Sequence, residues 1–511
     1  MGLRMKDTLD TTSYWHLTQD TARYPELTED AETDTLIIGG GITGVTCAFN
    51  LGRLGADAML IEASSLCGGT TGNTTGKATI QHGIIYSKLI KKMGNEAASL
   101  YYGAQMQALE FIKAFGKSRP DDFGYAENEA FIYASSDAER RLIEDEYNAA
   151  RELKIDAELI EKPAFPPESR CMMGYKGQAV IHPVRYVEML AKRAMDYGVK
   201  IFEHTKAIKI ADGDIIAVKC ENGAIIRAKH LIIATQFPIY EGMGAFFTRL
   251  YPRRSYAIAV KTKANWPDGS YINMGTPARS LRTHVENGER VLIVVGDGHV
   301  TARSGNMQEH FDELMRFAAA ASGFDNLIAK WSAQDYKTPD DLPFIGRLTK
   351  KSNIFVACGF AKWGITSGTL AGMMIPEIIL NGKSEFDELL APSRLNLKAS
   401  APTFLTEVGQ QVKELVHSKL EETDSIMDLE RGQARIIPYN GQRAGAFMDD
   451  DGQLTIVDIT CTHLGCELNW NNAERSWDCP CHGGRFNFDG RLLEGPPSNP
   501  LKILHQDKPA T

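Results

Sequence analysis

The sequence predicts an α/β protein whose C-terminal part is a small all-β domain. A chain of 511 residues is too long for one hydrophobic core, so we expect several domains. From residue 34 to about 390, buried-strand patterns alternate with helical ones, and segments 250–300 suggest an antiparallel sheet. After a Pro/Ser-rich connector, short strands follow between residues rich in Gly, Asp and Asn.

A βαβ unit opens the ordered pattern, in "DTLIIGGGITGVTCAFNLGRLGADAMLIEAS". Gly39 permits a tight turn after the first strand, Gly41 lets a pyrophosphate approach the backbone, and Gly44 allows close helix–strand packing. The helix start supplies free N–H groups, and Glu62 ends the second strand where an acid accepts bonds from a ribose. The predicted dinucleotide contacts here are Gly39, Gly41, Ile42, Thr43, Gly44 and Glu62.

The stretch after Glu62 favours FAD over a nicotinamide nucleotide. "ASSLCGGTTGNTTGKATIQHG" is rich in Gly and Thr, and its backbone and hydroxyl donors suit a cofactor that it wraps. We expect Thr70, Thr71 and Thr75 to contact the flavin nucleotide. The sequence contains no second G-x-G-x-x-G, so it shows no separate nicotinamide domain.

Residues 30–390 resemble the FAD-dependent oxidoreductases related to D-amino-acid oxidase, glycine oxidase and sarcosine oxidase. The resemblance rests on "IIGGGITG", "GGTTGNTTGKAT", "LIIATQ" and "TPDDLPFIG…IFVACGFAKWGITSG". It implies oxidation of a small amine or amino acid by hydride loss to the flavin. It also implies that the last segment closes over the flavin, which would be lined by Gly359, Lys362, Gly364, Thr366 and Ser367. Since "WSAQDYKTPDD" lacks a cysteine, we expect FAD to be bound without a covalent link.

Three side chains are candidates for the reacting face: Lys77, His82 and Lys362. The lysines would bind a substrate carboxylate or polarise the flavin. The alternative for each lysine is an ordinary solvated surface position, and His82 has the alternative of a hydrogen-bonded role within the fold. In such an enzyme the flavin performs the chemistry, while the protein supplies orientation and electrostatics.

Four of the nine cysteines lie in two short C-terminal clusters, "CTHLGC" and "CPCHGG". Cys461-x-His463 and Cys479-x-x-His482 each pair one cysteine with one histidine. A zinc finger pairs its cysteines first, whereas two Cys–His pairs suit a [2Fe–2S] cluster in which two histidines replace two cysteines on one iron. Zinc and a purely structural thiol cluster remain the alternatives at this point.

The C-terminal segment resembles the Rieske proteins of cytochrome bc complexes in "CTHLGC", "CPCHG" and the proline loop "EGPPSNPL". This resemblance assigns iron to Cys461, His463, Cys479 and His482. The respiratory type carries an extra cysteine pair, so we expect a disulfide between Cys466 and Cys481. Gly484 stands where many respiratory relatives have a serine that bonds a cluster sulfur. Its absence is expected to lower the reduction potential.

The predicted fold is therefore an α/β (α+β) FAD-binding Rossmann-like domain with an antiparallel-sheet substrate domain, plus a C-terminal all-β Rieske domain. The predicted parts are the oxidoreductase 30–391, with FAD-binding segments 30–86, 166–240 and 331–391 and substrate segments 87–165 and 241–330, then a linker with a helix over 392–422, and the Rieske domain 423–511.

The bulk composition restricts partners and location. The net charge of −9 gives no electrostatic footprint for nucleic acid, and no apolar run reaches the length of a membrane span. The N-terminal residues lack the apolar region of a secretory signal, so we expect a cytoplasmic protein. The other five cysteines, expected to be small buried hydrophobes, are Cys47, Cys67, Cys171, Cys220 and Cys358.

The predicted function is a flavin-dependent dehydrogenase or oxidase that passes electrons singly to its own [2Fe–2S] cluster and on to an unidentified acceptor. One alternative keeps the flavin oxidase but gives the electrons to oxygen, with the Rieske domain as a redox sensor or structural module. A second alternative is a non-enzymatic electron-transfer protein without a small substrate.

Overall fold

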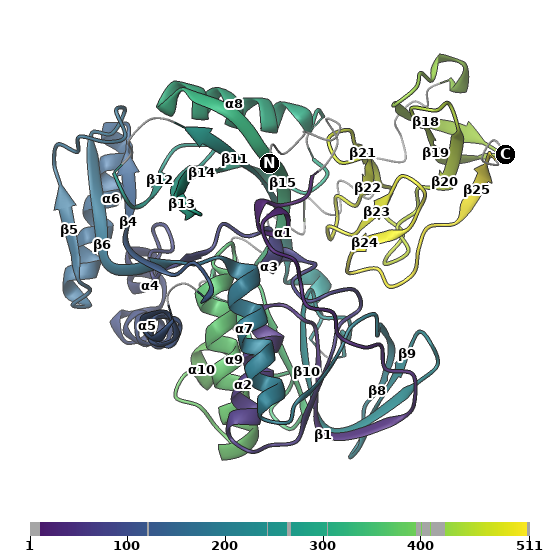
Figure 1. Ribbon diagram of the computed structural model, residues 1–511, viewed down its shortest axis with the longest axis horizontal. Helices are drawn as coiled ribbons and strands as arrows, with labels where there is room; N and C mark the ends of the chain where they lie inside the picture. The colour runs from purple at the N-terminus through teal and green to yellow at the C-terminus, as the bar shows by residue number, and fades with distance from the viewer. Residues whose placement is uncertain are drawn as a thin grey trace.

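The chain folds into a mostly parallel sheet with helices, a mostly antiparallel sheet in which β4 and β12 pair in parallel, and a C-terminal all-β domain (Figure 1). The computed structural model describes residues 11–119, 122–242, 244–262, 267–303, 305–394 and 425–507, together with 400 and 409. The helix and linker predicted over 392–422 lie almost wholly outside the described residues.

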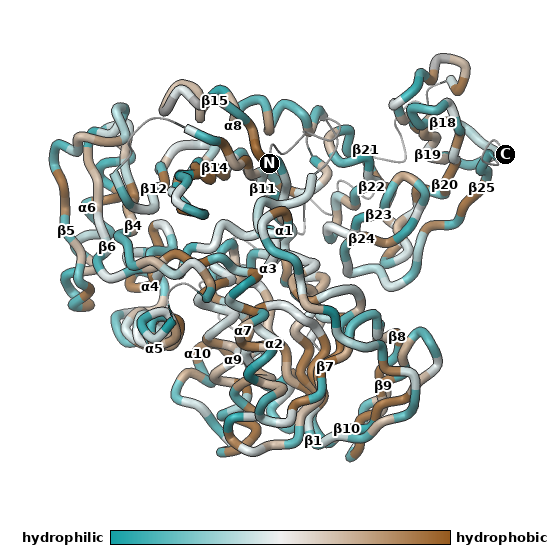
Figure 2. The backbone as a smooth tube through the Cα atoms, viewed as in Figure 1, coloured by the Kyte–Doolittle hydropathy of each residue, from teal (hydrophilic) through white to brown (hydrophobic). Residues whose placement is uncertain are grey.

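The nucleotide-binding part is built on an eight-stranded, mostly parallel sheet. Strands β1, β2, β7, β10 and β17 run parallel, while β16 and the β8–β9 hairpin add antiparallel edges. The central segments of β1, β2, β10 and β17 are apolar and buried, and Figure 2 shows the hydrophobic colouring of β1 and β10. The strands are β1 (Ala31–Ile38), β2 (Ala58–Ile61), β7 (Lys200–Phe202), β8 (Ala207–Ala211), β9 (Ile216–Cys220), β10 (Ile225–Gln236), β16 (Phe344–Arg347) and β17 (Ile354–Cys358).

Three helices pack together beside this sheet: α2 (Ile42–Arg53), α7 (Pro183–Asp196) and α9 (Gly364–Asn381) (Figure 1). Both α2 and α9 begin just after parallel strands, β1 and β17, so their N-termini meet at one edge of the sheet. A Cβ at Gly368 would lie 2.9 Å from the Thr43 hydroxyl oxygen, so the two helix starts are in contact. This edge is where open α/β sheets bind nucleotides.

The second sheet has nine strands, in the order β15-β11-β14-β13-β12-β4-β6-β3 with β5 beside β6. Helix α8 (Gln308–Ser322) packs on β11, β14 and β15. The strands are β3 (Lys77–Ala78), β4 (Ala126–Ala134), β5 (Ala157–Ile160), β6 (Cys171–Val180), β11 (Tyr251–Thr262), β12 (Ser270–Asn273), β13 (Arg279–Glu286), β14 (Glu289–Val300) and β15 (Phe324–Lys337).

The structure differs from the predicted segmentation at this sheet. Strand β6 lies in a stretch that we assigned to the FAD-binding part, yet it pairs with β4 in the antiparallel sheet. Strand β15 crosses the predicted boundary at residue 330. Within the substrate segment 87–165, β4 lies between helices α5 and α6. A strand's local pattern does not specify which sheet it joins, since partners lie far away in sequence.

The remaining helices surround these sheets. Two of them, α4 and α5, follow the glycine- and threonine-rich stretch, and α6 packs on β4, β5 and β6. They are α1 (Tyr14–Leu17), α3 (Thr70–Asn73), α4 (Tyr86–Met93), α5 (Asn95–Ser118), α6 (Asp137–Glu152) and α10 (Asp387–Leu390), with short 3₁₀ turns at Phe246–Thr248 and Ile426–Asp428.

The C-terminal domain is all-β, as predicted, and consists of two antiparallel four-stranded sheets. Its core gathers the apolar residues around the fully buried Trp477. One sheet is β18 (Ala434–Tyr439), β19 (Gln442–Met448), β20 (Leu454–Asp458) and β25 (Ile503–Gln506), and the other is β21 (Asn469–Asn471), β22 (Ser476–Asp478), β23 (Arg485–Asn487) and β24 (Leu492–Glu494).

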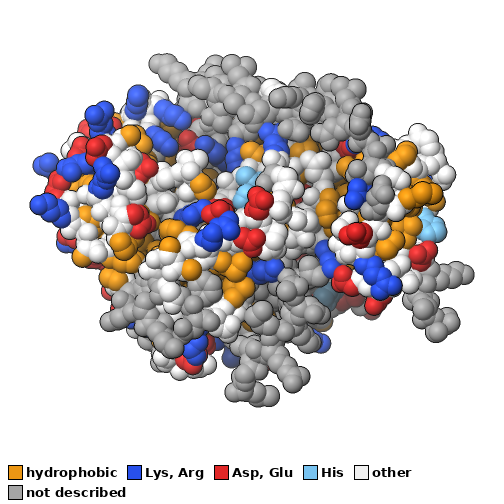
Figure 3. Space-filling model, turned by 90° about the horizontal axis from the view of Figure 1, so that it is seen from above, with side chains coloured by type: hydrophobic (Ala, Val, Ile, Leu, Met, Phe, Trp, Pro, Cys, Tyr) orange, Lys and Arg blue, Asp and Glu red, His pale blue; other side chains and the backbone are white. Residues whose placement is uncertain are grey.

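Within the described residues, no helix has both the length and the apolar character needed to cross a bilayer. Basic and acidic side chains are interspersed on the face drawn in Figure 3. The five scattered cysteines, Cys47, Cys67, Cys171, Cys220 and Cys358, are all buried, as expected of small hydrophobic side chains.

Candidate cofactor sites

The glycine turn between β1 and α2 has the backbone geometry that a pyrophosphate site requires. Gly39 has a φ of +116°, and a Cβ there would lie 2.5 Å from the carbonyl oxygen of Ala234. A Cβ at Gly44 would overlap the carbonyl oxygen of Gly39. At Gly41 the nearest neighbour of a Cβ would be the Thr71 hydroxyl, 3.0 Å away. The backbone of this turn therefore faces the threonine-rich loop without side chains in between.

Glu62 and Thr71 fix this turn from the second strand and the following loop. The Glu62 carboxylate accepts hydrogen bonds from the N–H of Gly40 at 2.7 Å and of Ser64 at 2.9 Å. The Thr71 hydroxyl accepts the N–H of Ile42 at 3.1 Å. Each carboxylate oxygen keeps lone pairs for further donors. The donor and acceptor set fits a nucleotide with a pyrophosphate and a ribose diol.

The segment predicted to close over the flavin has an unusual backbone. Gly359, Ala361 and Lys362 all have positive φ, of 76°, 51° and 77°. Two such non-glycine residues in succession cost free energy and persist where surrounding contacts enforce them, often at functional sites. Here the Ala361 N–H donates to the Tyr336 carbonyl, and the Lys362 N–H donates to the buried Asp335 carboxylate. Burial raises the pKa of Asp335 to about 6.

Two predicted lysines belong to a cluster of cations with Arg282. Lys77 is half-buried and donates to the Ser280 hydroxyl at 2.8 Å. Desolvation, reinforced by Arg282 and Lys362, lowers the pKa of Lys77 to about 7. The Lys362 side chain reaches solvent. Protein atoms still surround its ammonium closely, and this desolvation lowers the pKa of Lys362. Because Gly298 has no side chain, there is room beside it for the Lys362 ammonium.

Arg282, which our sequence interpretation missed, is almost completely buried at 2% exposure. Its guanidinium packs over Trp15 and donates once, from Nη2 to the Ile181 carbonyl at 3.2 Å. Nε and Nη1 have no hydrogen-bond partner among the described residues. Burial lowers the pKa of Arg282 to about 9. A buried guanidinium edge without an acceptor is costly unless an anion binds there.

His82 does not have the geometry of a proton acceptor. Its Nε2 lies 2.9 Å from the Thr79 carbonyl and 3.2 Å from the Thr366 hydroxyl, and its Nδ1 lies 2.7 Å from the Tyr101 hydroxyl. The carbonyl requires a proton on Nε2, so Nδ1 accepts from Tyr101. Burial lowers the pKa of His82 to about 3. The structure thus favours the hydrogen-bonded role that we weighed as its alternative.

The other residues of the closing segment are also positioned by the fold. Gly364 begins helix α9, and Thr366 and Ser367 lie buried in its first turn. The Ser367 hydroxyl accepts from Gln105 at 3.3 Å, and the Thr366 hydroxyl lies 3.2 Å from the Thr79 carbonyl. Thr70 lies in the threonine-rich loop, on the other side of the predicted flavin site, and its hydroxyl donates to the Gln334 carbonyl at 2.9 Å. Thr75 is half-buried in the loop before β3.

The two C-terminal Cys–His loops have the same backbone construction. In each loop the first cysteine N–H donates at 2.8 Å to a carbonyl five residues later, Cys461 to Cys466 and Cys479 to Gly484. In each, a glycine four residues on bonds back at 3.0 Å, and these glycines have φ of +76° and +75°. The glycines that carry these φ values are Gly465 and Gly483. The loops therefore present their side chains in matching orientations.

The predicted iron ligands face one another between the loops. The thiols of Cys461 and Cys479 are hydrogen-bonded, and the rings of His463 and His482 are 5.0 Å apart between centroids. Both histidine Nδ1 atoms are buried without a hydrogen-bond partner among the described residues. Two sulfurs and two unpartnered imidazole nitrogens fit a [2Fe–2S] cluster with two ligands on each iron.

The bond from Cys461 and the N–H groups of the loop lower the pKa of Cys479, which favours the thiolate that iron binds. Burial lowers the pKa of His482 to about 4. The imidazole is therefore neutral at physiological pH, and a neutral ring nitrogen is the form that coordinates a metal.

The predicted disulfide between Cys466 and Cys481 is present, with 6.6 Å between the Cα atoms. The sulfurs of Cys466, Cys479 and Cys481 also lie within 4.8 Å of one another, a spacing that a metal ion would tolerate. The disulfide engages two of these three sulfurs. It leaves Cys479 to act with Cys461, and it ties the two loops together beside the histidines.

The C-terminal domain docks on β11 and β15 through a buried network of charges. Arg254, only 1% exposed, donates from Nε and Nη2 to the Glu474 carboxylate at 3.0 and 3.1 Å. The Ser332 hydroxyl donates to the same carboxylate at 2.6 Å. On the other side Arg485 pairs with Glu474 at 3.1 Å and with Asp478 at 3.0 Å. Sequence inspection missed this network because its members lie 220 residues apart in the chain.

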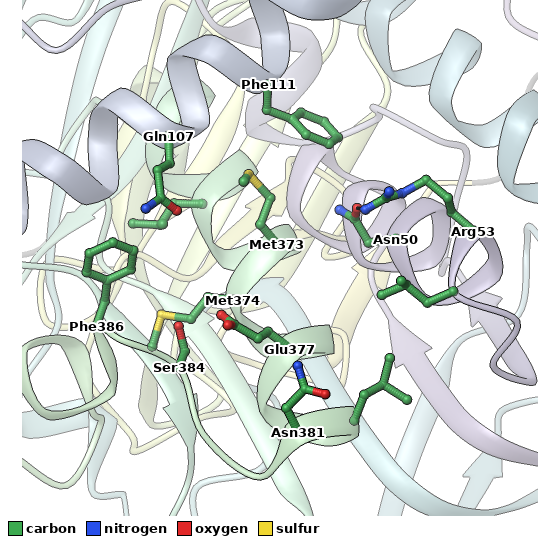
Figure 4. Close-up of a pocket in the computed structure, with 13 residues that line it drawn as sticks. Asn50, Arg53, Gln107, Phe111, Met373, Met374, Glu377, Asn381, Ser384 and Phe386 are labelled. Carbon is green, nitrogen blue, oxygen red and sulfur yellow. Dashed lines mark hydrogen bonds between the residues drawn. The ribbon is translucent and has the colours of Figure 1, made fainter.

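Two cavities flank helix α9. One of about 250 Å³ lies beside the closing segment and is lined by aromatic rings that include His82, Tyr101 and Trp363. The other, of about 360 Å³, opens between α2, α5 and α9, where Arg53 and Glu377 line it (Figure 4). Of the predicted site residues, His82 lines the first cavity, and none lines the second.

Comparison with known proteins supports both parts of the chain. The family model described as "FAD dependent oxidoreductase" matches residues 34–378, and the model of the Rieske [2Fe-2S] domain matches residues 422–505. The Bacillus subtilis (strain 168) protein YhfW, whose name describes a Rieske 2Fe-2S iron-sulfur protein, is 36% identical over 97% of this chain and 98% of its own length.

Two further similarities cover the parts separately. The cytochrome b6-f complex iron-sulfur subunit of Chlorobaculum thiosulfatiphilum is 38% identical over 71 residues, which are 14% of this chain and 39% of that subunit. The structure of L-proline dehydrogenase from P. horikoshii has a TM-score of 0.61 at 20% identity, over 72% of this chain and 98% of that one. With these matches, the chain belongs to the FAD-dependent oxidoreductase family and carries a C-terminal Rieske domain, with FAD and a [2Fe–2S] cluster as cofactors.

Proposed function

We propose that this enzyme oxidises a small amine or amino acid at FAD and passes the electrons one at a time to its cluster and then to an external acceptor. The observation that carries the proposal is the position of β15. Its residues 334–336 hold the closing segment of the flavin site and also contact the Rieske loop that contains His482. A flavin exchanges one or two electrons and the cluster one, so the fusion couples a two-electron oxidation to one-electron transfer.

The residue assignments belong to this proposal. The pyrophosphate and ribose of FAD would contact the glycine turn and Glu62, and the flavin would lie between the threonine loop and the closing segment. Cys461 and Cys479 would bind one iron, and His463 and His482 the other. The unpartnered Nδ1 atoms of the two histidines and the hydrogen-bonded thiols of the two cysteines support this ligand set.

The cation cluster supports a substrate with a carboxylate. Lys77, Lys362 and Arg282 supply three cationic groups, and Asp335 is the carboxylate that contacts the backbone of Lys362. The Nε and Nη1 of Arg282, which have no partner among the described residues, leave N–H donors for anionic oxygens such as those of a carboxylate. An α-amino acid carries such a group beside the C–H bond to be oxidised, so amino acids are favoured over simple amines.

The anaerobic titration of the purified protein with amines and amino acids tests the proposal. We expect a substrate with a carboxylate to bleach the flavin absorbance and, in the same titration, to produce the EPR signal of the reduced cluster. A protein whose flavin no compound of either class reduces, although dithionite reduces both centres, would contradict the proposed activity. The non-enzymatic alternative predicts that outcome, while oxygen as the acceptor predicts that the flavin is bleached and the cluster stays oxidised.

The binding of a carboxylate is expected to weaken as the pH rises through about 7. Because the pKa of Lys77 is lowered to about 7, its ammonium is charged below that pH and neutral above it. A charge-assisted hydrogen bond contributes about 1.5–3 kcal/mol, so its loss should raise the Kd about tenfold or more. The Kd of propionate, followed by flavin absorbance between about pH 6 and pH 8, measures this without turnover.

Lys77→Arg serves as the matched variant, because a guanidinium stays charged across that range. It should bind propionate with a Kd independent of pH. An unsubstituted protein whose Kd does not change with pH would exclude Lys77 from the carboxylate site.

A further inference from the structure

The Rieske loop that contains His482 receives hydrogen bonds from the flavin domain. The Tyr336 hydroxyl donates to the carbonyl of His482 at 3.1 Å, and lies 3.3 Å from the carbonyl of Gly495. The Gln334 amide donates to the carbonyl of Gly483 at 2.8 Å. The ring of His482 in turn bonds to the backbone of Phe247. One predicted iron ligand is thus contacted from another domain at both its backbone and its ring.

These contacts are internal and strongly constrained. Tyr336 and Gln334 are each 1% exposed, and the Gln334 amide also donates to the Tyr336 hydroxyl at 3.1 Å. The Gln334 side-chain oxygen accepts from Thr301 at 2.8 Å. A Cβ at Gly483 would lie 2.7 Å from the Gln334 side-chain oxygen, so the loop backbone approaches this side chain closely. Buried polar groups with every partner satisfied hold one geometry.

The same short stretch of β15 faces the flavin site on its other side. The Gln334 carbonyl accepts from Thr70 at 2.9 Å and from the Gln236 amide. The Tyr336 carbonyl accepts from Ala361 at 3.0 Å, and Asp335 holds the Lys362 N–H. Residues 334–336 therefore bond to both walls of the predicted flavin site and to the cluster loop.

We propose that Gln334 and Tyr336 are positioning residues of the cluster, through which the flavin domain sets the cluster's reduction potential. Hydrogen bonds around the ligands of an iron–sulfur centre stabilise its reduced, more negative state. Donors to the carbonyls of His482 and Gly483 act in this direction, and they fix the orientation of the ligand ring. Within the Rieske domain, position 484 is a glycine that packs against Pro497, so it has no side-chain hydrogen-bond donor. Gln334 and Tyr336 supply donors from outside that domain.

The proposal rests on the cluster assignment made above but not on the substrate. It is tested on the full holoprotein by a dithionite titration, so failure to find an oxidisable substrate does not affect the outcome. The readouts are the midpoint potential and the EPR spectrum of the cluster, which a merely structural contact between domains would leave unchanged in a folded protein.

Tyr336→Phe is the primary variant, because it removes the hydroxyl and leaves the aromatic ring unchanged. We expect the equilibrium between reduced and oxidised cluster to shift about tenfold toward the oxidised form, which for one electron is a lowering of about 59 mV. Gln334→Met removes the other donor and should shift the potential in the same direction. Tyr256→Phe is the control, since that buried hydroxyl contacts His299 and Met307 instead.

The outcomes separate clearly. A lower potential in Tyr336→Phe and Gln334→Met, with Tyr256→Phe unchanged, supports the proposal. Unchanged potentials and EPR spectra in the first two variants overturn it. If Tyr336→Phe loses its cluster during purification, Gln334→Met decides, and an unchanged potential there has the same consequence.

Discussion

Replacing Arg254 with methionine is expected to destabilise the docked Rieske domain by about 3–5 kcal/mol. The guanidinium is 1% exposed and provides two of the hydrogen bonds to Glu474. Without it, the buried carboxylate keeps Arg485, Ser332 and Asn471 as partners but loses one of its two cations. Removing one member of a buried charge network costs this much because the group left behind loses its compensation. Urea unfolding followed by the visible absorbance of the cluster measures the change.

Arg475→Met is the matched control for Arg254→Met. Arg475 lies in the Rieske domain, next to Glu474 in the sequence, and pairs with Asp450, whose carboxylate is 64% exposed. Exposed pairs of this kind contribute about 0–1 kcal/mol. Adding Glu474→Gln to Arg254→Met should recover part of the loss, because the uncompensated charge is then gone. A cost for Arg254→Met as small as that of the control would mean that this interface does not hold the domains together.

Replacing Gly44 with alanine is expected to lower flavin content at least about tenfold, since overpacking costs about 1–3 kcal/mol and here the conflict is with backbone. The added Cβ would overlap the Gly39 carbonyl oxygen, so helix α2 must move away from the turn that we propose for the pyrophosphate. The ratio of flavin to cluster absorbance in the purified protein measures the loss. The cluster serves as an internal reporter of a folded C-terminal domain.

Two other glycines calibrate this result. Gly41→Ala would place its Cβ 3.0 Å from the movable Thr71 hydroxyl, so we expect an intermediate loss. Gly103 lies within helix α5 with no atom near its Cβ position, so alanine there should leave flavin content unchanged. Full flavin content in Gly44→Ala would contradict the assignment of this turn.

The sequence predicted those features whose residues lie close together in the chain. The glycine turn with Glu62 and the paired Cys–His loops each occupy a few dozen residues, and their backbone requirements show in the residue types. Gly39, Gly465 and Gly483 have the positive φ that such turns demand. The domain types follow from the same local patterns.

The rest depends on contacts between distant segments, which local patterns do not specify. In the sequence, Arg254 looks like any other strand residue. Its role depends on the contact between β11 and the loop that contains Glu474, which only the fold brings about. Arg282 and Asp335 acquire their roles only through burial beside other strands. His82 has a residue type suited to catalysis, yet Thr79 and Tyr101 occupy both of its nitrogens. Strand β4 was hidden between two strongly helical segments.

The fusion of the two domains has a simple physical rationale. A free electron carrier must find the flavin enzyme by diffusion, whereas here the Rieske loop is bonded to β15 directly beside the flavin-closing segment. The buried charge network keeps that arrangement in register. Under the proposed function, transfer between the centres would not depend on protein concentration.

Rapid mixing under anaerobic conditions tests this central claim most directly. The protein is mixed with a substrate found in the titration, and flavin and cluster absorbance are followed together at several protein concentrations. The account predicts that the cluster is reduced within the first turnover, at a rate that does not change with protein concentration. Cluster reduction that lags flavin reduction by many turnovers, or whose rate rises with protein concentration, would contradict it.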